Sequence, residues 1–145
     1  MILEKITLLS LEEYTKNEKI IPVIEEYWWL RTPGDNFNAC YVYPNGNADA
    51  CGFHVYLETI SVRPALKLNL EFDDPLYWHR TKTLVGAKIK YGKYTWTILN
   101  TKNGELYALC DEVISKHYFD EETNIWEESE LKHWLETEGL KLITT

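Results

Sequence analysis

Two short turn sequences constrain this chain more than any other feature. Pro44-Asn45-Gly46 and Asn103-Gly104 each lie between runs in which polar and apolar residues alternate. Alternation with a period of two is typical of a half-buried strand, and Asn-Gly accepts the positive backbone angles of a tight turn. The pattern therefore predicts two antiparallel hairpins, one over residues 39–54 and one formed by residues 87–100 and 105–114.

The first hairpin allows two loop lengths. A two-residue Asn45-Gly46 loop would place Pro44 where a strand N–H has to donate a hydrogen bond, which proline cannot do. A three-residue loop gives Pro44 its favoured place in a type I turn and gives Gly46 the left-handed position that follows. We expect the longer loop, which pairs Tyr43 with Asn47 and Cys40 with Ala50.

Other apolar runs predict further strands, at residues 3–9, 27–31 and 60–70. The last run is interrupted by Pro64, which a sheet tolerates at an edge or a bulge. Ser10 is placed to cap a short helix that runs from Leu11 to about residue 17.

A second helix is expected near the end of the sequence. Asn124 and Glu127 have the spacing of a capping box, and apolar residues then recur on one face of a helix over residues 127–138. Gly139 is placed to end this helix. The expected fold class is α+β, with mostly antiparallel strands and hairpins and with two helices.

Composition limits the classes of partner. The 145 residues are 45% hydrophobic and carry a net charge of −8 at pH 7, which is typical of one folded, acidic domain. Such a chain offers no basic field for phosphates or for anionic lipids, so nucleic acid and membrane are not expected partners. No apolar run approaches the roughly 20 residues of a membrane span. We expect the chain in the cytoplasm of a host cell or in a phage particle assembled there.

The cysteines indicate free thiols. There are three of them, Cys40, Cys51 and Cys110, and no two form a CxxC pair. An odd number without such spacing argues against both a disulfide framework and a zinc site. The expected offset of Cys40 from Cys51 in the hairpin argues against a bond between these two.

Three ordered motifs carry a resemblance to a known family. They are Trp28-Trp29-Leu30-Arg31-Thr32-Pro33-Gly34, then Tyr41-Val42-Tyr43 with Asn45-Gly46, then Val62-Arg63-Pro64-Ala65-Leu66. Together they resemble the WWLR[ST]PG and VRPAL pattern of an uncharacterised family of bacteria and their phages. That family is similar to the C-type-lectin-like and sulfatase-modifying-factor folds. The resemblance thus implies a C-type-lectin-like domain.

The second half of the chain resembles the same family in a different order. The strand run at 94–99 and the helix run at 126–135 look like elements that come first in most members. Their order here is that of a circular permutation, which compact domains tolerate because chain ends often lie close together. We expect a single domain over residues 1–145, in which 1–70 form the WWLRTPG/VRPAL half, 71–85 a connection and 86–145 a hairpin-plus-helix half.

The sequence lacks the common patterns of catalysis and metal binding. Asn45, Asn47 and Asp49 alternate as in a calcium loop, but Ala50 and Tyr56 stand where that loop needs Gly and Glu. The histidines, which are His54, His79, His117 and His133, lack HxH or HExxH spacing. The reactive-cysteine and iron-binding patterns of the resembled folds are not visible either. We therefore expect no metal, no cofactor and no enzymatic activity.

The two arginines of the motifs have two interpretations. Arg31 and Arg63 could hold an anionic ligand, because a guanidinium donates up to five hydrogen bonds. They could instead satisfy the carbonyls of irregular segments inside the fold. We favour the structural role for both, and also for Trp28 and Trp29.

The residues that flank the first hairpin form the candidate binding site. They are Asp35, Asn36, Phe37, Asn38, Phe53, His54, Tyr56 and Glu58. Short polar groups beside aromatic rings are typical of recognition surfaces, and ordinary solvated loops are the alternative.

Three functions remain open. The first is a non-enzymatic binding module, encoded by a phage or prophage, that recognises a protein or glycan through loops 34–38 and 52–59. The second is an acidic intracellular protein that inhibits a host or defence enzyme, for which the net charge is the only support. The third is a divergent enzyme of the modifying-factor type, which would lack the ligands and thiols of that class. We favour the binding module.

Overall fold

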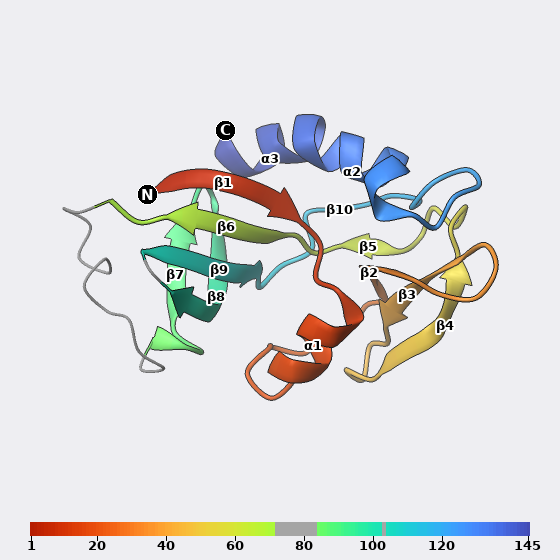
Figure 1. The fold of residues 1–145 in the computed structure, drawn as a ribbon, viewed down its shortest axis with the longest axis horizontal. Coiled ribbons are helices and arrows are strands. Elements are labelled where there is room, and N and C mark those ends of the chain that lie inside the picture. Colours follow the sequence, from red (N-terminus) through yellow and green to blue (C-terminus); the bar gives the residue numbers. More distant parts are fainter. Residues whose placement is uncertain (72–83, 103) are drawn as a thin grey trace.

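The computed structural model describes residues 1–71, 84–102 and 104–145. Most of the expected connection at 71–85 therefore lies outside the described residues, as does Asn103 of the second predicted turn. Within the described residues the strands form two five-stranded sheets, with helices packed against them (Figure 1). The expected α+β class with mostly antiparallel strands is confirmed.

Sheet A is antiparallel throughout its described part. Its strands in spatial order are β1 (Ile2–Thr7), β6 (Ala65–Asn69), β9 (Glu105–Cys110), β8 (Tyr94–Lys102) and β7 (Lys88–Tyr91). The β6–β9 pair joins the first half of the chain to the second.

Sheet B contains a parallel pair among antiparallel ones. Its strands in spatial order are β10 (Ser115–Lys116), β5 (Ser61–Val62), β2 (Trp28–Pro33), β3 (Asn38–Val42) and β4 (Ala48–His54). The parallel pair is β2 with β5, where Trp28 lies opposite Ser61.

The chain passes from one sheet to the other at Arg63 and Pro64. The single strand expected over 60–70 is wrong, because β5 belongs to sheet B and β6 to sheet A. The carbonyl of Pro64 accepts a hydrogen bond from the Cys110 N–H at 2.9 Å. Proline fits here because the residue between two sheets has no ladder partner for an N–H to reach.

Arg63 is completely buried beside this crossover. Its Nε donates to the Cys110 carbonyl at 2.7 Å, and its guanidinium carbon lies 4.9 Å from the centroid of the Trp28 ring. Burial lowers the pKa of Arg63 to about 10. The structural role expected of this arginine is confirmed by these contacts.

The first hairpin has the loop that the sequence predicts. The Gly46 N–H donates to the Tyr43 carbonyl at 2.9 Å, Gly46 has a φ of +91°, and Tyr43 pairs with Asn47 at 2.7 Å. Opposite Cys40 the regular ladder is interrupted, because the register shifts between Ala39 and Tyr41.

The strand expected over 87–100 is two strands. Gly92, with a φ of +61°, turns the chain so that β7 folds back on β8 and Ile89 lies opposite Trp96. A Cβ on Gly92 would lie 2.0 Å from the Ile143 carbonyl oxygen, so glycine is required by space as well as by angle. The following hairpin, β8 with β9, forms around Gly104 as expected.

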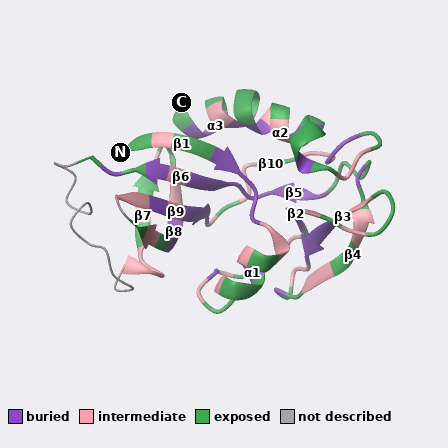
Figure 2. Cartoon of the chain, in the orientation of Figure 1, coloured by how far each residue is buried: buried purple, intermediate pink, exposed green. Residues whose placement is uncertain are grey.

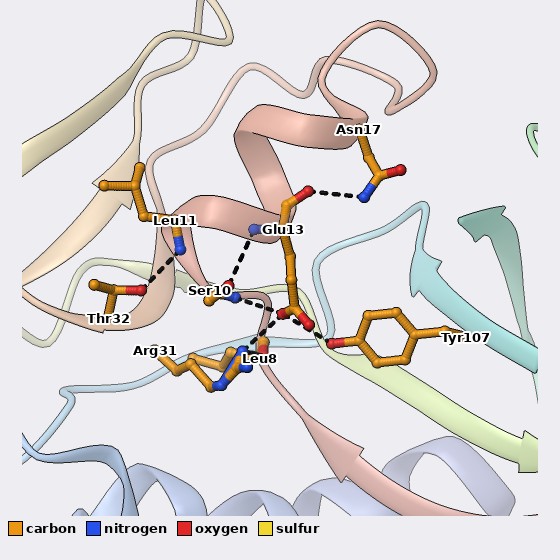
Figure 3. Close-up of polar contacts among 8 residues, drawn as sticks. All are labelled: Leu8, Ser10, Leu11, Glu13, Asn17, Arg31, Thr32 and Tyr107. Atoms are coloured by element: carbon orange, nitrogen blue, oxygen red, sulfur yellow. Dashed lines mark hydrogen bonds and ion pairs between the residues drawn. The ribbon is translucent and has the colours of Figure 1, made fainter. Parts of the chain in front are cut away.

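Helix α1 (Leu11–Asn17) begins at Ser10, as predicted, with Ser10 and Glu13 forming a reciprocal capping box. Glu13 Oε1 also accepts from Arg31 Nη1 of β2 at 2.7 Å and from the Tyr107 hydroxyl of β9 at 3.1 Å (Figure 3). One carboxylate thus connects the start of α1 to both sheets.

The C-terminal helix is longer than expected and begins elsewhere. A 3-10 turn, η3 (Trp126–Glu128), precedes a continuous helix made of α2 (Glu130–Trp134), a π-helical turn η4 (Leu135–Gly139) and α3 (Leu140–Thr144). Ser129 is the N-cap, so the capping box expected at Asn124 is wrong. Gly139 does not end the helix. Its φ is −61°, and a Cβ there would lie 2.9 Å from Leu135 Cδ1.

Two groups of buried side chains fill the space between these elements. One lies between sheet A and the C-terminal helix and includes Leu66, Trp96 and Leu135. The other lies under α1 and includes Tyr14 and Trp28. Figure 2 shows the buried residues concentrated in the strands and the outward side of the helices exposed. No helix of the described residues is long and apolar enough to span a membrane.

Replacing Trp29 by Ala tests the core. Trp29 is fully buried, packs edge-on against Phe119 at 5.6 Å and donates from Nε1 to the His117 carbonyl. We expect Trp29→Ala to lower the unfolding free energy by about 3–5 kcal/mol in urea denaturation, because it leaves a large cavity. Trp29→Phe keeps much of the packing and should lower it less. A loss below about 1 kcal/mol for the Ala variant would contradict this packing.

Thiol titration tests the cysteines. Cys51 is exposed, whereas Cys40 and Cys110 are buried, and burial raises the pKa of Cys40 to about 11 and that of Cys110 to about 12. A hydrogen bond with Asp35 also raises the pKa of Cys51. Because the thiolate is the reactive form, we expect Cys51 alone to react in the folded protein at neutral pH, and more slowly than a free thiol. All three should react after denaturation without reductant. Cys51→Ser should remove the native reaction, and a missing thiol after denaturation would show a disulfide.

Candidate functional site

Three loops meet at one end of sheet B, on the right in Figure 1. They are the β2–β3 loop at 34–37, the segment after β4 at 55–60, and the segment after β10 at 117–125. The Val55 N–H donates to the Phe37 carbonyl and the Phe119 N–H donates to the Val55 carbonyl, both at 2.8 Å. Main-chain hydrogen bonds therefore hold the three loops side by side.

The side chain of Asn124 fixes the β2–β3 loop. Its Nδ2 lies 3.0 Å from the carbonyl oxygens of Asn36 and Asn38 and 3.4 Å from that of Gly34. An amide directed at these carbonyls supplies a donor to backbone groups of the loop and of the first residue of β3. This contact, rather than helix capping, is the role of Asn124.

Two glycines allow the backbones beneath the loops to touch. A Cβ on Gly34 would lie 2.4 Å from the Cys51 carbonyl oxygen, and one on Gly52 would lie 2.4 Å from the Ala39 carbonyl oxygen. Gly52 also has a φ of +88°, which favours glycine. Both positions therefore require glycine, and they set a fixed frame under the loops.

Asp49 supports the irregular part of this frame. Its Oδ1 accepts from the N–H groups of Cys51 at 2.8 Å and Gly52 at 3.2 Å, and its Oδ2 accepts from the Tyr43 hydroxyl at 2.9 Å. The hydrogen bond from Tyr43 contributes most to lowering the pKa of Asp49. Of the three side chains that resemble a calcium loop in the sequence, Asn45 and Asp49 thus accept hydrogen bonds within the hairpin itself. Among the described residues no three His, Cys, Asp or Glu side chains are grouped as metal ligands.

The structure leaves most of the predicted site residues exposed. Exposed are Asp35, Asn36, Phe37, His54, Tyr56 and Glu58, whereas Asn38 and Phe53 are half-buried. Two of them are large aromatic side chains, with 60% of Phe37 and 54% of Tyr56 accessible to solvent.

The exposed aromatic rings of the predicted site each lie next to another ring. Phe37 and His54 have ring centroids 6.2 Å apart, and His54 Nδ1 accepts a hydrogen bond from the Tyr56 N–H at 3.1 Å. The Tyr56 ring lies against Tyr118, at 6.0 Å between centroids. Asp35 is tied through its backbone, since its N–H donates to the Cys51 carbonyl at 2.9 Å.

Phe53 is better described as a support than as a contact residue. It stacks on Tyr41 with centroids 3.8 Å apart and lies 5.3 Å from the Tyr27 ring. Asn38 is likewise committed to the fold, because its backbone pairs with both Gly34 and Asp35. The structure therefore separates these two from the exposed members of the predicted set.

Sequence reasoning missed several residues that share this surface. Leu57 is 40% exposed within the second loop, and Ile125 is 44% exposed next to Asn124. Tyr118 and Asn124 come from a segment more than sixty positions along the chain, so no local pattern links them to the hairpin. We define the loop face as the exposed residues Asp35, Asn36, Phe37, His54, Tyr56, Leu57, Glu58 and Ile125.

Comparison with known proteins gives one match. Residues 4–70 match a family described as "Domain of unknown function (DUF6273)". The match is consistent with an uncharacterised family, and it ends after β6, just short of half the chain. No curated protein and no solved structure matches the chain.

Removing the Asn124 amide should loosen the loop that it holds. In Asn124→Ala three carbonyls lose a donor, so we expect amide hydrogen exchange at residues 34–38 to accelerate about tenfold or more while sheet A stays protected. Mass spectrometry with peptide resolution measures this. The matched control is Asn47→Ala, because Asn47 is exposed and its side chain makes no hydrogen bond within the described residues. Equal exchange in both variants would contradict the role of Asn124.

Proposed function

We propose that this chain is a non-enzymatic binding module whose loop face recognises another protein. The observation that carries the proposal is the exposure of Phe37 and Tyr56, at 60% and 54%, on loops whose backbone is held by Asn124, Gly34 and Gly52. Exposed rings on an ordered frame are typical of binding hot spots.

The fixed backbone under the loops favours binding, because the loops lose little conformational entropy when a partner binds. The loops are already joined by main-chain hydrogen bonds at Phe37, Val55 and Phe119. The ordering of the loops therefore reduces the affinity for a partner less than it would if the loops were disordered before binding. Tyr and Phe also have few rotatable bonds, so they supply contact area at low entropic cost.

The chemistry of the surface favours a protein over a glycan. Leu57 and Ile125 add aliphatic area to the aromatic rings, and aliphatic side chains pack well against apolar protein anchors. Asp35 and Glu58 add exposed carboxylates to a chain whose net charge is −8. A partner with basic groups around an apolar centre fits this combination.

The proposal extends to the type of fold. A C-type-lectin-like domain with permuted halves is supported by the three motifs, which lie in β2, β3 and the β5–β6 crossover. It is also supported by the β6–β9 pairing between the halves. The two chain ends lie at the same end of the molecule in Figure 1, as a permutation requires. A lectin-like domain places recognition on loops above a rigid scaffold, as here.

The triple variant Phe37→Ala, Tyr56→Ala, Glu58→Ala tests this assignment. The protein, immobilised, is used to capture partners from bacterial lysate, and the captured protein is then purified for a direct measurement of Kd. We expect the triple variant to weaken binding at least about a hundredfold, because two exposed aromatic anchors are lost. Its melting temperature should change little, since these side chains are exposed.

A matched control keeps the result specific. Ile2→Ala, Val23→Ala, Glu12→Ala removes a similar exposed area elsewhere, because Ile2 and Val23 are 55% and 62% exposed. This variant should bind as the unmodified chain does. Full binding by the loop-face variant, or equal loss in the control, would refute the loop face. Binding to a glycan array instead of to protein would refute the partner class.

A further inference from the structure

A cleft of about 550 Å³ lies on the polar face of sheet A, and none of its lining residues belongs to the loop face. Strand side chains form its floor, because Lys5 lies opposite Lys67 and Lys67 lies opposite Tyr107 in the register. Residues directly opposite in a sheet point to the same side. Glu13 of α1 and Arg31 of β2 form a wall. A cleft of this size is in the range of small-molecule sites.

The charge of the cleft is opposite to that of the chain. Four basic side chains line it, Lys5, Arg31, Lys67 and Lys102, against the carboxylates Glu13 and Glu105. The protein as a whole carries −8. A concave surface lined by one sign of charge concentrates ligands of the other sign. The cleft therefore selects anions.

Both carboxylates of the cleft are already engaged. Glu13 Oε1 accepts from Ser10, Arg31 and Tyr107, as Figure 3 shows. Glu105 pairs with Lys67 at 2.8 Å. Lys5 and Lys102, in contrast, have no ion-pair partner within the part of the chain that the structure describes. Two cations are thus left for a ligand.

One wall of the cleft contains a buried hydroxyl that does not contact a ligand. Thr7 lines the cleft and is only 3% exposed, and its Oγ1 is buried without a hydrogen-bond partner among the described residues. Because a water-sized group in the cleft does not reach this oxygen, the unpaired cations are the ligand contacts of the cleft.

We propose that this cleft binds a small ligand through a phosphate group. A phosphate dianion matches the two unpaired cations, and its oxygens accept from the Lys5 and Lys102 ammonium groups. Arg31 stays paired with Glu13 and contributes its charge at the rim. The remaining volume beside Tyr107 holds the organic part of a phosphate ester. This binding is independent of protein recognition at the loop face.

Calorimetric titration with glucose 6-phosphate, inorganic phosphate and glucose tests the proposal. The two phosphate compounds should bind, with affinity falling as NaCl is raised, and glucose should not bind. Tighter binding of the ester identifies an organic phosphate as the ligand, and equal binding identifies free phosphate. Absence of binding by both phosphate compounds at millimolar concentration, or equal binding of glucose, would overturn the proposal.

A double variant locates the site. Lys5→Gln with Lys102→Gln should weaken phosphate binding about tenfold or more, because each substitution removes one charge pair. The matched control is Lys19→Gln with Lys90→Gln, two exposed lysines without a described partner outside the cleft. An unchanged Kd in the cleft variant, or the same loss in the control, would refute the site.

Discussion

The crossover at Arg63 and Pro64 is the constraint on which the rest of the structure depends. Two consecutive short strands, β5 and β6, belong to different sheets, so the positions of the sheets are set by how these two residues are held. The Arg63 guanidinium lies over the Trp28 ring and its Nε reaches the Cys110 carbonyl, while Cys110 donates back to Pro64. Sheet A, sheet B and the crossover thus meet in one buried contact. These contacts compensate the burial of the charge only in part, because Arg63 Nη1 and Nη2 have no hydrogen-bond partner among the described residues.

The contact divides the molecule into two regions with different chemistry. Beyond sheet B, the loops present aromatic and aliphatic side chains on a frame of paired backbone. On the polar face of sheet A, the strands present cations around a cleft. Glu13 is the link between them, because its carboxylate joins α1 to Arg31 of sheet B and Tyr107 of sheet A. The two regions share a scaffold and no described side chain of the loop face lines the cleft.

Helix caps and turns that depend on neighbouring residues could be predicted from the sequence, whereas contacts between distant residues could not. The capping box at Ser10 and the turn that ends at Gly46 follow from residues within four positions of one another. The change of sheet at Pro64 and the contact of Asn124 with the β2–β3 loop depend on partners tens of residues away. The Gly92 turn was not predicted although its glycine is visible, because it lacks the Asn-Gly or Asp-Gly pair that marks a tight turn and is flanked by the strand-forming residues Tyr91 and Tyr94. The cleft could not be predicted because its basic residues lie on separate strands, where they alternate with core residues. In the sequence, each strand has the pattern of one solvent-exposed face.

The close backbone contacts at Gly34 and Gly52 have a consequence for how this surface can change over time. Main-chain atoms and one distant amide determine the course of the loops, so the exposed side chains of the loop face contribute little to the stability of the fold. The side chains at those positions can be replaced without changing the backbone. New side chains there are therefore presented on loops that already have a defined conformation. A lineage with such an arrangement can alter its target in a few mutational steps while every intermediate still folds. The scaffold can thus stay the same while the binding specificity of the loop face changes.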